Sequence, residues 1–127
     1  MKRTTNIKNK INRFFGDKDI VTCTATATGA TTGTIPASAS TVNAVGITGQ
    51  TGYLILLPTP VVGKQLIIYN DSGFAFNLAA ADAANTYVNG AKAAGYKLAI
   101  ATAKVAYCDC VSSTQWVVVI NTYTPAS

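Results

Sequence analysis

Hydrophobic residues in the middle of the chain occur in short runs of strand length, each closed by residues that favour turns. Residues 53–57 and 66–69 are such runs, rich in aliphatic and aromatic side chains. Pro58, Pro60 and Gly63 lie between them. They exclude one continuous helix, because proline lacks the backbone N–H that a helix needs and glycine lowers helix stability. The pattern therefore predicts two β-strands over these runs.

The four residues that follow the second run predict a tight turn. Residues 70–73 are Asn-Asp-Ser-Gly, in which Asn and Asp bond their own backbone and Gly accepts a positive φ. We expect residues 74–78, which are mostly apolar and aromatic, to form a third strand. The turn predicts a hairpin, with residues 74–78 antiparallel to residues 66–69.

Weaker alternating patterns predict β-structure over most of the chain after residue 20. Alternation of Thr with small residues predicts a strand from residue 20 to about residue 28, with one hydroxyl face. Further strands are expected within residues 38–48 and at residues 86–88, 96–100, 105–111 and 115–120, with turns at 89–90 and 112–114 and a loop at 79–84. Eight or so short strands separated by polar turns are typical of an all-β fold, a single β-sandwich or a barrel.

The N-terminal segment differs from the rest of the chain in charge. Residues 1–20 carry six basic side chains and two aspartates, a net charge of +4, and the whole chain has +5. This division predicts a basic N-terminal arm, residues 1–20, and a nearly neutral β-domain, residues 21–127. A basic arm on a neutral body indicates an acidic partner, which can be nucleic acid, an anionic membrane or an acidic protein surface.

Residues 4–16 of the arm have the spacing of a short amphipathic helix. Ile7, Ile11, Phe14 and Phe15 fall at positions i, i+4, i+7 and i+8, which places them on one helical face. A helix of this length is marginal alone in water. We therefore expect it to become ordered when its apolar face docks on another surface.

The composition disfavours enzyme chemistry. The chain has no His and no Glu, so the commonest general base and metal ligand are absent. We expect no catalytic residues, no metal and no cofactor. Cys23, Cys108 and Cys110 are expected to be buried free thiols, because the last two point to the same face of a strand and cannot easily bridge each other.

The sequence shows no recognisable secretory signal and no run of about 20 apolar residues of the kind that spans a membrane. We expect the product to remain in the cytoplasm of the cell that makes it, or to enter an assembly there. Charged residues make up 12% of the chain, about half of the ~25% typical of globular domains. A surface so poor in charge is expected to be partly covered by copies of the same chain.

Four signals follow one another between residues 50 and 121. They are an apolar strand that ends in proline, Leu56-Leu57-Pro58; a strand Gly-Lys-Gln-Leu-Ile-Ile-Tyr-Asn at residues 63–70; an aromatic and apolar strand followed by Asn89-Gly90 and an Ala-rich segment; and a strand with Cys, a Ser/Thr turn and Gln115-Trp116. This order resembles a small β-domain of tailed-bacteriophage structural proteins, among capsid decoration (cement) proteins and head fibres. The resemblance implies a trimeric β-sandwich or jelly-roll-like module on the outside of a virion head. The arm has no counterpart in this pattern, so its role as an anchor is inferred from its charge and apolar face.

The predicted function is that of a non-enzymatic virion structural protein, a capsid decoration protein that forms homotrimers. It is made in the host cytoplasm and lies on the outer surface of the capsid, where its partner is the major capsid protein. The arm residues expected to bind the capsid are Lys2, Arg3, Ile7, Lys8, Lys10, Ile11, Arg13, Phe14 and Phe15. The apolar members fill grooves between capsid subunits, and the basic members pair with acidic capsid residues.

The alternative is a virion fibre or receptor-binding module whose body binds a cell-surface glycan through exposed aromatic side chains. Tyr53, Tyr87 and Tyr96 are the candidates, whereas Trp116 opens an apolar strand and is expected in the core. Binding of the arm to a membrane surface is less favoured, although basic residues beside Ile and Phe suit an anionic interface. Binding to nucleic acid is also less favoured, because the two aromatic residues of the arm stand together at one end and are not interleaved with basic residues. We therefore expect neither a membrane nor nucleic acid as a partner.

Overall fold

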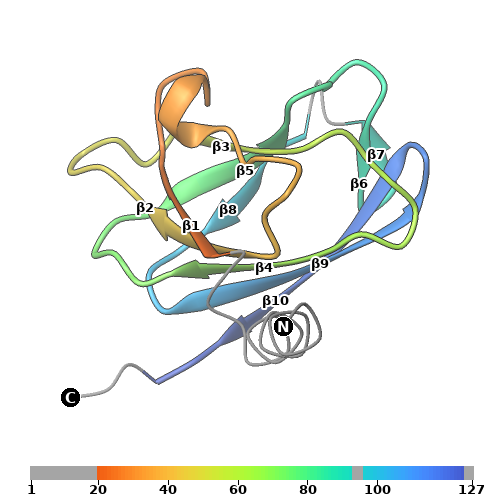
Figure 1. The fold of residues 1–127 in the computed structure, drawn as a ribbon. Coiled ribbons are helices and arrows are strands. Elements are labelled where there is room, and N and C mark those ends of the chain that lie inside the picture. Colours follow the sequence, from red (N-terminus) through yellow and green to blue (C-terminus); the bar gives the residue numbers. More distant parts are fainter. Residues whose placement is uncertain (1–19, 93–95, 125–127) are drawn as a thin grey trace, which may run out of the picture.

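The computed structural model describes residues 20–92 and 96–124, and its regular structure is almost entirely β (Figure 1). The strands are β1 (Ile20–Thr24), β2 (Thr41–Val45), β3 (Leu54–Leu57), β4 (Gln65–Asn70), β5 (Phe76–Ala80), β6 (Tyr87–Val88), β7 (Ala91–Lys92), β8 (Leu98–Ile100), β9 (Lys104–Ser112) and β10 (Gln115–Thr122). One turn of 3-10 helix, η1 (Thr31–Gly33), lies between β1 and β2. The predicted all-β class is confirmed.

The strands form two layers that enclose one core (Figure 1). The large sheet has seven strands in the order β1-β2-β4-β9-β10-β6-β7, and the small sheet has three in the order β3-β5-β8. In Figure 1 the small sheet lies above β4, β9 and β10, and the short strands β6 and β7 stand at one end. This is the sandwich-like arrangement that the strand pattern predicts.

Successive strands from β2 to β5 alternate between the two sheets. β2 and β4 are parallel neighbours in the large sheet, and β3 and β5 are parallel neighbours in the small sheet. The predicted hairpin of residues 66–69 and 74–78 is therefore wrong, because β4 pairs with β2 and β9 whereas β5 pairs with β3 and β8. The turn after β4 does form, since Ser72 N–H donates to Asn70 Oδ1 at 3.1 Å. It carries the chain across the sandwich and not back along the same sheet.

Asn70 explains why the chain crosses at this point. Its side chain is fully buried. Its Nδ2 donates to the carbonyl oxygens of Phe74 and Ile100, at 2.9 Å each. Ile100 ends β8, so the Asn70 amide links the last residue of β4 in the large sheet to the small sheet. A buried amide needs such partners, and here one of them, Ile100, lies on the opposite layer.

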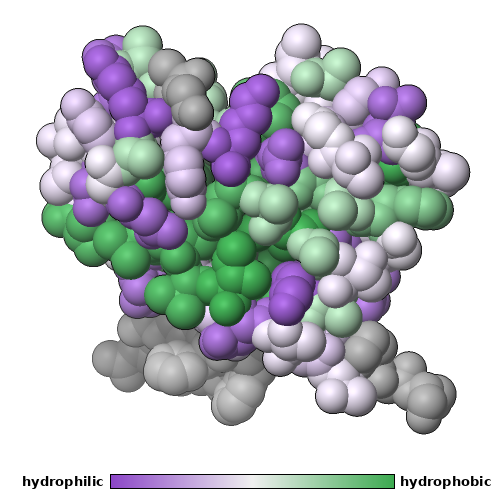
Figure 2. Space-filling model, turned by 180° about the vertical axis from the view of Figure 1, so that it is seen from behind, coloured by the Kyte–Doolittle hydropathy of each residue, from purple (hydrophilic) through white to green (hydrophobic). Residues whose placement is uncertain are grey.

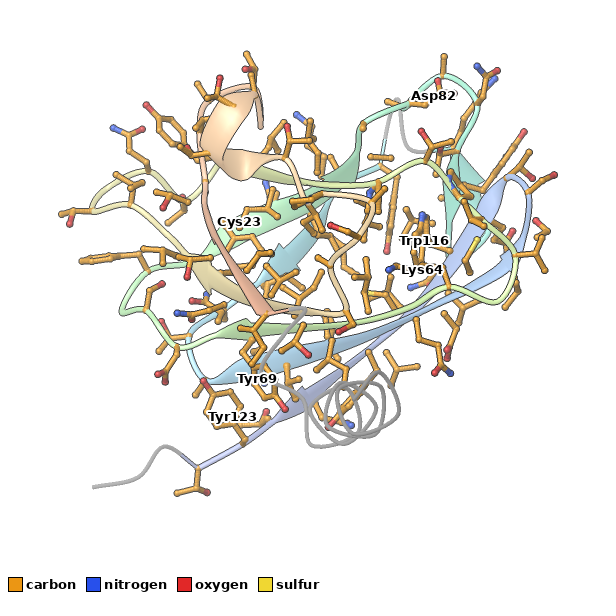
Figure 3. The ribbon with its side chains drawn as sticks, in the orientation of Figure 1. Cys23, Lys64, Tyr69, Asp82, Trp116 and Tyr123 are labelled. Carbon is orange, nitrogen blue, oxygen red and sulfur yellow. The ribbon has the colours of Figure 1, made fainter. Side chains whose placement is uncertain are left out.

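The core lies between the sheets and is built from alternate residues of each strand, as strand geometry requires. Trp116 and Phe76 are its largest fully buried side chains. Trp116 Nε1 donates to the Pro58 carbonyl oxygen at 3.2 Å, so the polar atom of the indole is satisfied. The predicted core position of Trp116 is confirmed, and Figure 3 shows this side chain between the layers.

The C-terminal part of the chain follows its predicted course. β9 and β10 form a long antiparallel hairpin. Asn89 and Gly90 connect β6 to β7 with φ values of 52° and 83°, which is the positive-φ pair of a type I′ turn. The Asn89 side chain donates to the Val118 carbonyl oxygen at 3.0 Å and accepts from the Val118 N–H at 2.7 Å. This amide continues the pairing of β6 with β10 beyond the end of the short strand.

Several boundaries differ from the predictions: for example, β5 and β8 begin at Phe76 and Leu98, two residues after the predicted starts at 74 and 96. The first strand ends at Thr24, and its predicted continuation to about residue 28 is reduced to one isolated bridge between Thr26 and Leu54. The predicted loop at residues 79–84 is wrong for its first two residues, because Ala79 and Ala80 pair with β3. The predicted helix at residues 4–16 lies outside the described residues.

Candidate functional site

The outer face of the large sheet, turned away from the small sheet, carries a row of mainly apolar side chains. The strand register aligns one residue from each of β1, β2, β4, β9 and β10. These residues form the outer row: Ile20, Thr41, Ile67, Tyr107 and Val119. Ile20, Tyr107 and Val119 are exposed over 47%, 41% and 54% of their surface. Exposed apolar surface that is contiguous, and not scattered, marks interaction sites.

Few charges accompany the outer row. Among the described residues of these five strands, Asp109 is the charged residue that alternation places on the outer face. Its carboxylate accepts a hydrogen bond from Gln65 Nε2 at 2.9 Å. Hydrophobic surface occurs on another side as well, and Figure 2 shows it as a contiguous green area in the middle of the view from behind. The domain thus offers broad, weakly charged surfaces to other molecules.

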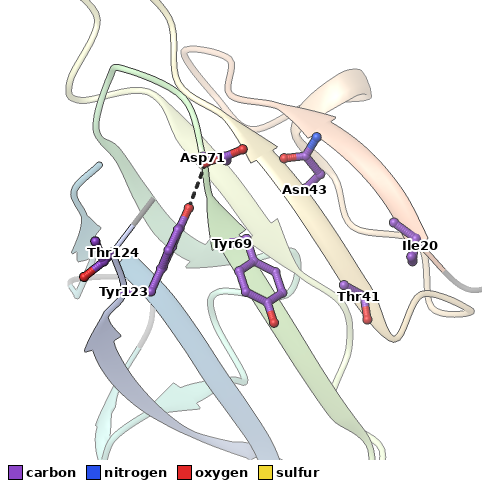
Figure 4. Close-up of a pocket in the computed structure, with 7 residues that line it drawn as sticks. All are labelled: Ile20, Thr41, Asn43, Tyr69, Asp71, Tyr123 and Thr124. Carbon is purple, nitrogen blue, oxygen red and sulfur yellow. Dashed lines mark hydrogen bonds between the residues drawn. The ribbon is translucent and has the colours of Figure 1, made fainter. Parts of the chain in front are cut away.

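A pocket of about 480 Å³ opens at one end of the outer face (Figure 4). We name it the tyrosine pocket, and it is lined by Ile20, Thr41, Asn43, Tyr69, Asp71, Tyr123 and Thr124. The lining comes from β1, β2, β4 and the residues that follow β4 and β10. Its volume lies within the range of about 300–1,000 Å³ that is typical of small-molecule sites.

Tyr69 and Tyr123 form an aromatic wall of this pocket (Figures 3 and 4). Their ring centroids lie 6.0 Å apart and the ring planes meet at 77°, an edge-to-face arrangement. The Tyr123 hydroxyl lies 3.2 Å from the Asn70 carbonyl oxygen and 3.1 Å from Asp71 Oδ1, and donates toward both. The Tyr123 N–H donates to the Ala103 carbonyl oxygen at 3.0 Å. These contacts hold the Tyr123 ring in place.

The pocket contains polar groups that can form hydrogen bonds with a ligand. Burial, followed by the hydrogen bond to Asp71, raises the pKa of the Tyr123 hydroxyl, so this group remains protonated at neutral pH. Within residues 20–92 and 96–124, no side chain or backbone group bonds to the side chains of Thr41 and Asn43. The described residues therefore leave the Thr41 hydroxyl and the Asn43 amide available to a ligand.

The sequence-based candidates for binding lie elsewhere. The nine arm residues predicted to bind a capsid lie outside the described residues. Tyr87 is exposed over 37% of its surface, whereas Tyr53 and Tyr96 are partly buried against the core and Trp116 is fully buried. None of these four aromatic residues lines the tyrosine pocket. The sequence analysis did not single out Tyr69 and Tyr123, because no sequence signal pairs the two.

The cysteines do not form a reactive site. Cys23, Cys108 and Cys110 are buried and free, as predicted. Burial, with a smaller contribution from the charge of Asp109, raises the pKa of Cys108 to about 12. The thiolate is the reactive form, so Cys108 is inert at neutral pH. Within the part of the chain that the structure describes, no three His, Cys, Asp or Glu residues are grouped so that they could hold a metal ion.

Comparisons with known proteins assign no family to the chain. No protein-family model matches it, and no curated protein matches it. The helical structure of the described residues includes no segment with the length and apolar character needed to cross a membrane.

Proposed function

We propose that this chain is a non-enzymatic structural protein of a virion, a capsid decoration (cement) protein. The β-domain forms homotrimers on the outer surface of the capsid, and residues 1–20 anchor each copy to the major capsid protein. The resemblance of residues 50–121 to such proteins supports this proposal. The two-sheet all-β architecture supports it as well, because it is the fold that the resemblance implies.

The observation that carries the proposal is the outer row. Ile20, Tyr107 and Val119 leave about half of their surface in water, although full burial of such a side chain contributes about 1.5–3 kcal/mol. The scarcity of charge around them removes electrostatic opposition to contact between identical copies. We therefore assign the outer row to the interface between copies in the trimer.

The arm starts at the rim of the same face. Ile20 belongs to the outer row and directly follows residues 1–19, and β1 is an edge strand of the large sheet. A segment of this length reaches about 30 Å as a helix and about 60 Å when extended. It is therefore long enough to contact a neighbouring surface while the sheet face is covered by another copy. Exposed ion pairs contribute only about 0.2–1 kcal/mol each, so Phe14 and Phe15 should dominate the affinity of the arm.

The test of the anchor is binding to undecorated capsids, assembled from the major capsid protein of the genome that encodes this chain. The full-length protein is compared with a variant that lacks residues 1–19 but keeps Ile20 and all of β1. We expect binding by the full-length protein and none by the truncated one. Replacing Phe14 and Phe15 by Ser should weaken binding more than replacing Lys8 and Lys10 by Gln. Equal binding with and without the arm would contradict the proposal.

The test of the trimer is light scattering of the purified protein. We expect a trimer for the full-length chain, and dissociation on Val119→Lys, which places a charge in the outer row. Val61→Lys is the matched control, because Val61 is a valine at least as exposed, 64% against 54% for Val119, in the loop between β3 and β4. A monomeric wild-type chain would refute the trimer, and a trimer that survives Val119→Lys would exclude the outer row from its interface.

A further inference from the structure

We propose that the tyrosine pocket binds a neutral saccharide, one or two sugar units in size. This activity is independent of the predicted anchor, because the pocket lies in the β-domain and the anchor lies in the arm. The pocket shares Ile20 and Thr41 with the outer row, so sugar binding requires that contact between copies leave the pocket open. Failure of capsid binding would leave the saccharide proposal intact, and failure of saccharide binding would leave the decoration proposal intact.

The pocket is a small hollow between neighbouring strands and the residues that follow β10. Thr41 and Asn43 project from β2 and Tyr69 projects from the neighbouring strand β4 on the same side of the sheet, and Ile20 stands beside them on β1 (Figure 4). Tyr123 closes the opposite side. A hollow of about 480 Å³ is suited to a small ring compound, whereas a protein partner would need a much larger surface.

The pocket combines an aromatic ring with polar groups that can bind hydroxyls. A sugar ring has apolar C–H faces and a rim of hydroxyl groups, each of which donates and accepts hydrogen bonds. Tyr69 leaves 37% of its surface exposed, which makes its ring available to a C–H face. Asn43 and Thr41 can each donate and accept, and the Asp71 carboxylate accepts. The pocket therefore matches both parts of a sugar.

Anions, purely apolar ligands and cations fit the lining of the pocket less well than a neutral saccharide does. Among the described residues that line the pocket there is no Lys or Arg, whereas Asp71 is one of them, so phosphates and carboxylates find no cationic partner there and meet a like charge. A purely apolar ligand would bury the polar groups of Asn43 and Asp71 without hydrogen bonds, which is costly. A cation could use Asp71 and a tyrosine ring, but it would leave the Thr41, Asn43 and Thr124 groups without a role.

The aromatic wall of the pocket is preorganised for binding. Tyr123 lies just after β10, where its hydroxyl is held by Asn70 and Asp71 and its backbone by Ala103. Its ring in turn meets Tyr69 edge to face. An aromatic wall that is already in place lowers the entropy lost when a ligand binds.

The experiment is saturation-transfer NMR on the full-length protein, with a panel of glucose, galactose, mannose, N-acetylglucosamine, lactose and cellobiose. Choline and lysine methyl ester are included as cationic probes. Each probe is used at up to about 10 mM, at which a site with a Kd of about 1 mM is mostly occupied. We expect transfer from the aromatic protons of the protein to ring protons of at least one sugar.

Variants then localise the site. Tyr69→Ala should weaken sugar binding by at least about tenfold, the loss of one aromatic contact, while Tyr69→Phe retains most of it. Tyr87→Ala is the matched control, because Tyr87 has the same 37% exposure but lies on β6. Asn43→Ala should weaken binding without unfolding the protein, since Asn43 is exposed; circular dichroism verifies the fold of each variant.

Three results would overturn the proposal. They are the absence of transfer to every sugar, transfer to choline or lysine methyl ester without transfer to sugars, and sugar binding that is unchanged in Tyr69→Ala. The second result would assign the pocket to a cation.

Discussion

Replacing Asn70 by Ala should destabilise the domain more than any other change at a single asparagine among the described residues. Asn70 is a fully buried polar residue, and its side chain takes part in four hydrogen bonds. Nδ2 donates to Phe74 and Ile100, and Oδ1 accepts from the N–H and the hydroxyl of Ser72. Alanine removes all four and leaves a cavity between the two sheets.

The loss of unfolding free energy in Asn70→Ala depends on which partners of the lost hydrogen bonds water can reach. The bond to the Ile100 carbonyl is buried, and an unsatisfied buried group costs about 1–3 kcal/mol. The Phe74 and Ser72 groups lie near the surface, where water replaces part of the interaction, so each lost bond costs about 0.5–1 kcal/mol. The total is a loss of about 2.5–6 kcal/mol, which for a domain of this size lowers Tm by roughly 10–25 °C.

The assay is urea unfolding followed by the fluorescence of Trp116, the single tryptophan and a fully buried one. Asn43→Ala is the matched control: Asn43 is an exposed asparagine on β2, and its replacement should change the free energy of unfolding by no more than about 0.5 kcal/mol. Asn70→Asp keeps the size and the acceptors but removes the amide donors. Its carboxylate would face two carbonyl oxygens, which raises its pKa.

Because a raised carboxyl pKa favours the protonated form in the folded state, Asn70→Asp should regain stability relative to wild type as the pH falls through that pKa. This pH dependence distinguishes a donor role of Asn70 from simple space filling. If Asn70→Ala cost no more than Asn43→Ala, the link between the sheets would not run through this amide and the explanation of the chain crossing would be wrong.

Three further predictions concern single positions in the described part of the chain. Gly46→Ala should cost about 1–3 kcal/mol in unfolding free energy, because a Cβ would meet the Phe74 carbonyl oxygen, whereas Gly52→Ala, which meets nothing within 4 Å, should be nearly neutral; equal effects would contradict this. Thr86→Val should raise the free energy of unfolding by about 1 kcal/mol, because the buried Thr86 hydroxyl has no hydrogen-bond partner among the described residues; a destabilised variant would point to a partner. Cys108 has its pKa raised from 9.0 to about 12, so its stabilising contribution should be complete below pH 9 and decline as the pH rises toward 12. In urea titrations, the difference in unfolding free energy between wild type and Cys108→Ala should therefore shrink between pH 9 and pH 12. A difference that stays constant over this interval would contradict a raised pKa of Cys108.

Local sequence patterns predicted the strands well, because the relevant interactions act between near neighbours. The strand pattern around residues 108–110 placed Cys108 and Cys110 on one face as buried thiols, and the apolar run over residues 115–120 placed Trp116 in the core; the structure confirms both. The Asn89-Gly90 turn was predicted from the two residues that adopt its positive φ values. A period of two tells which side of a strand is buried, and this is a property of the strand alone.

The partners of the strands could not be predicted in the same way. The turn at residues 70–73 is compatible with a hairpin and with a crossing to the other sheet, and the local residues do not distinguish them. The choice depends on Ile100, which lies 30 positions after Asn70 in the chain and accepts its amide hydrogen bond. The predicted antiparallel hairpin failed for this reason.

Composition and local pattern are enough to predict a basic N-terminal segment, an all-β body with few charged residues, and a chemistry that uses neither His nor Glu. Folding brings Ile20, Ile67, Tyr107 and Val119 into one row on the outer face and places Tyr69 against Tyr123 beside Asp71. Composition and alternation depend only on single residues and their near neighbours in the sequence. A row or a pocket instead requires strands that are distant in the sequence to lie side by side in one register. That register is set by the packing of the two sheets around Trp116 and Phe76, and it becomes visible only when the chain is folded.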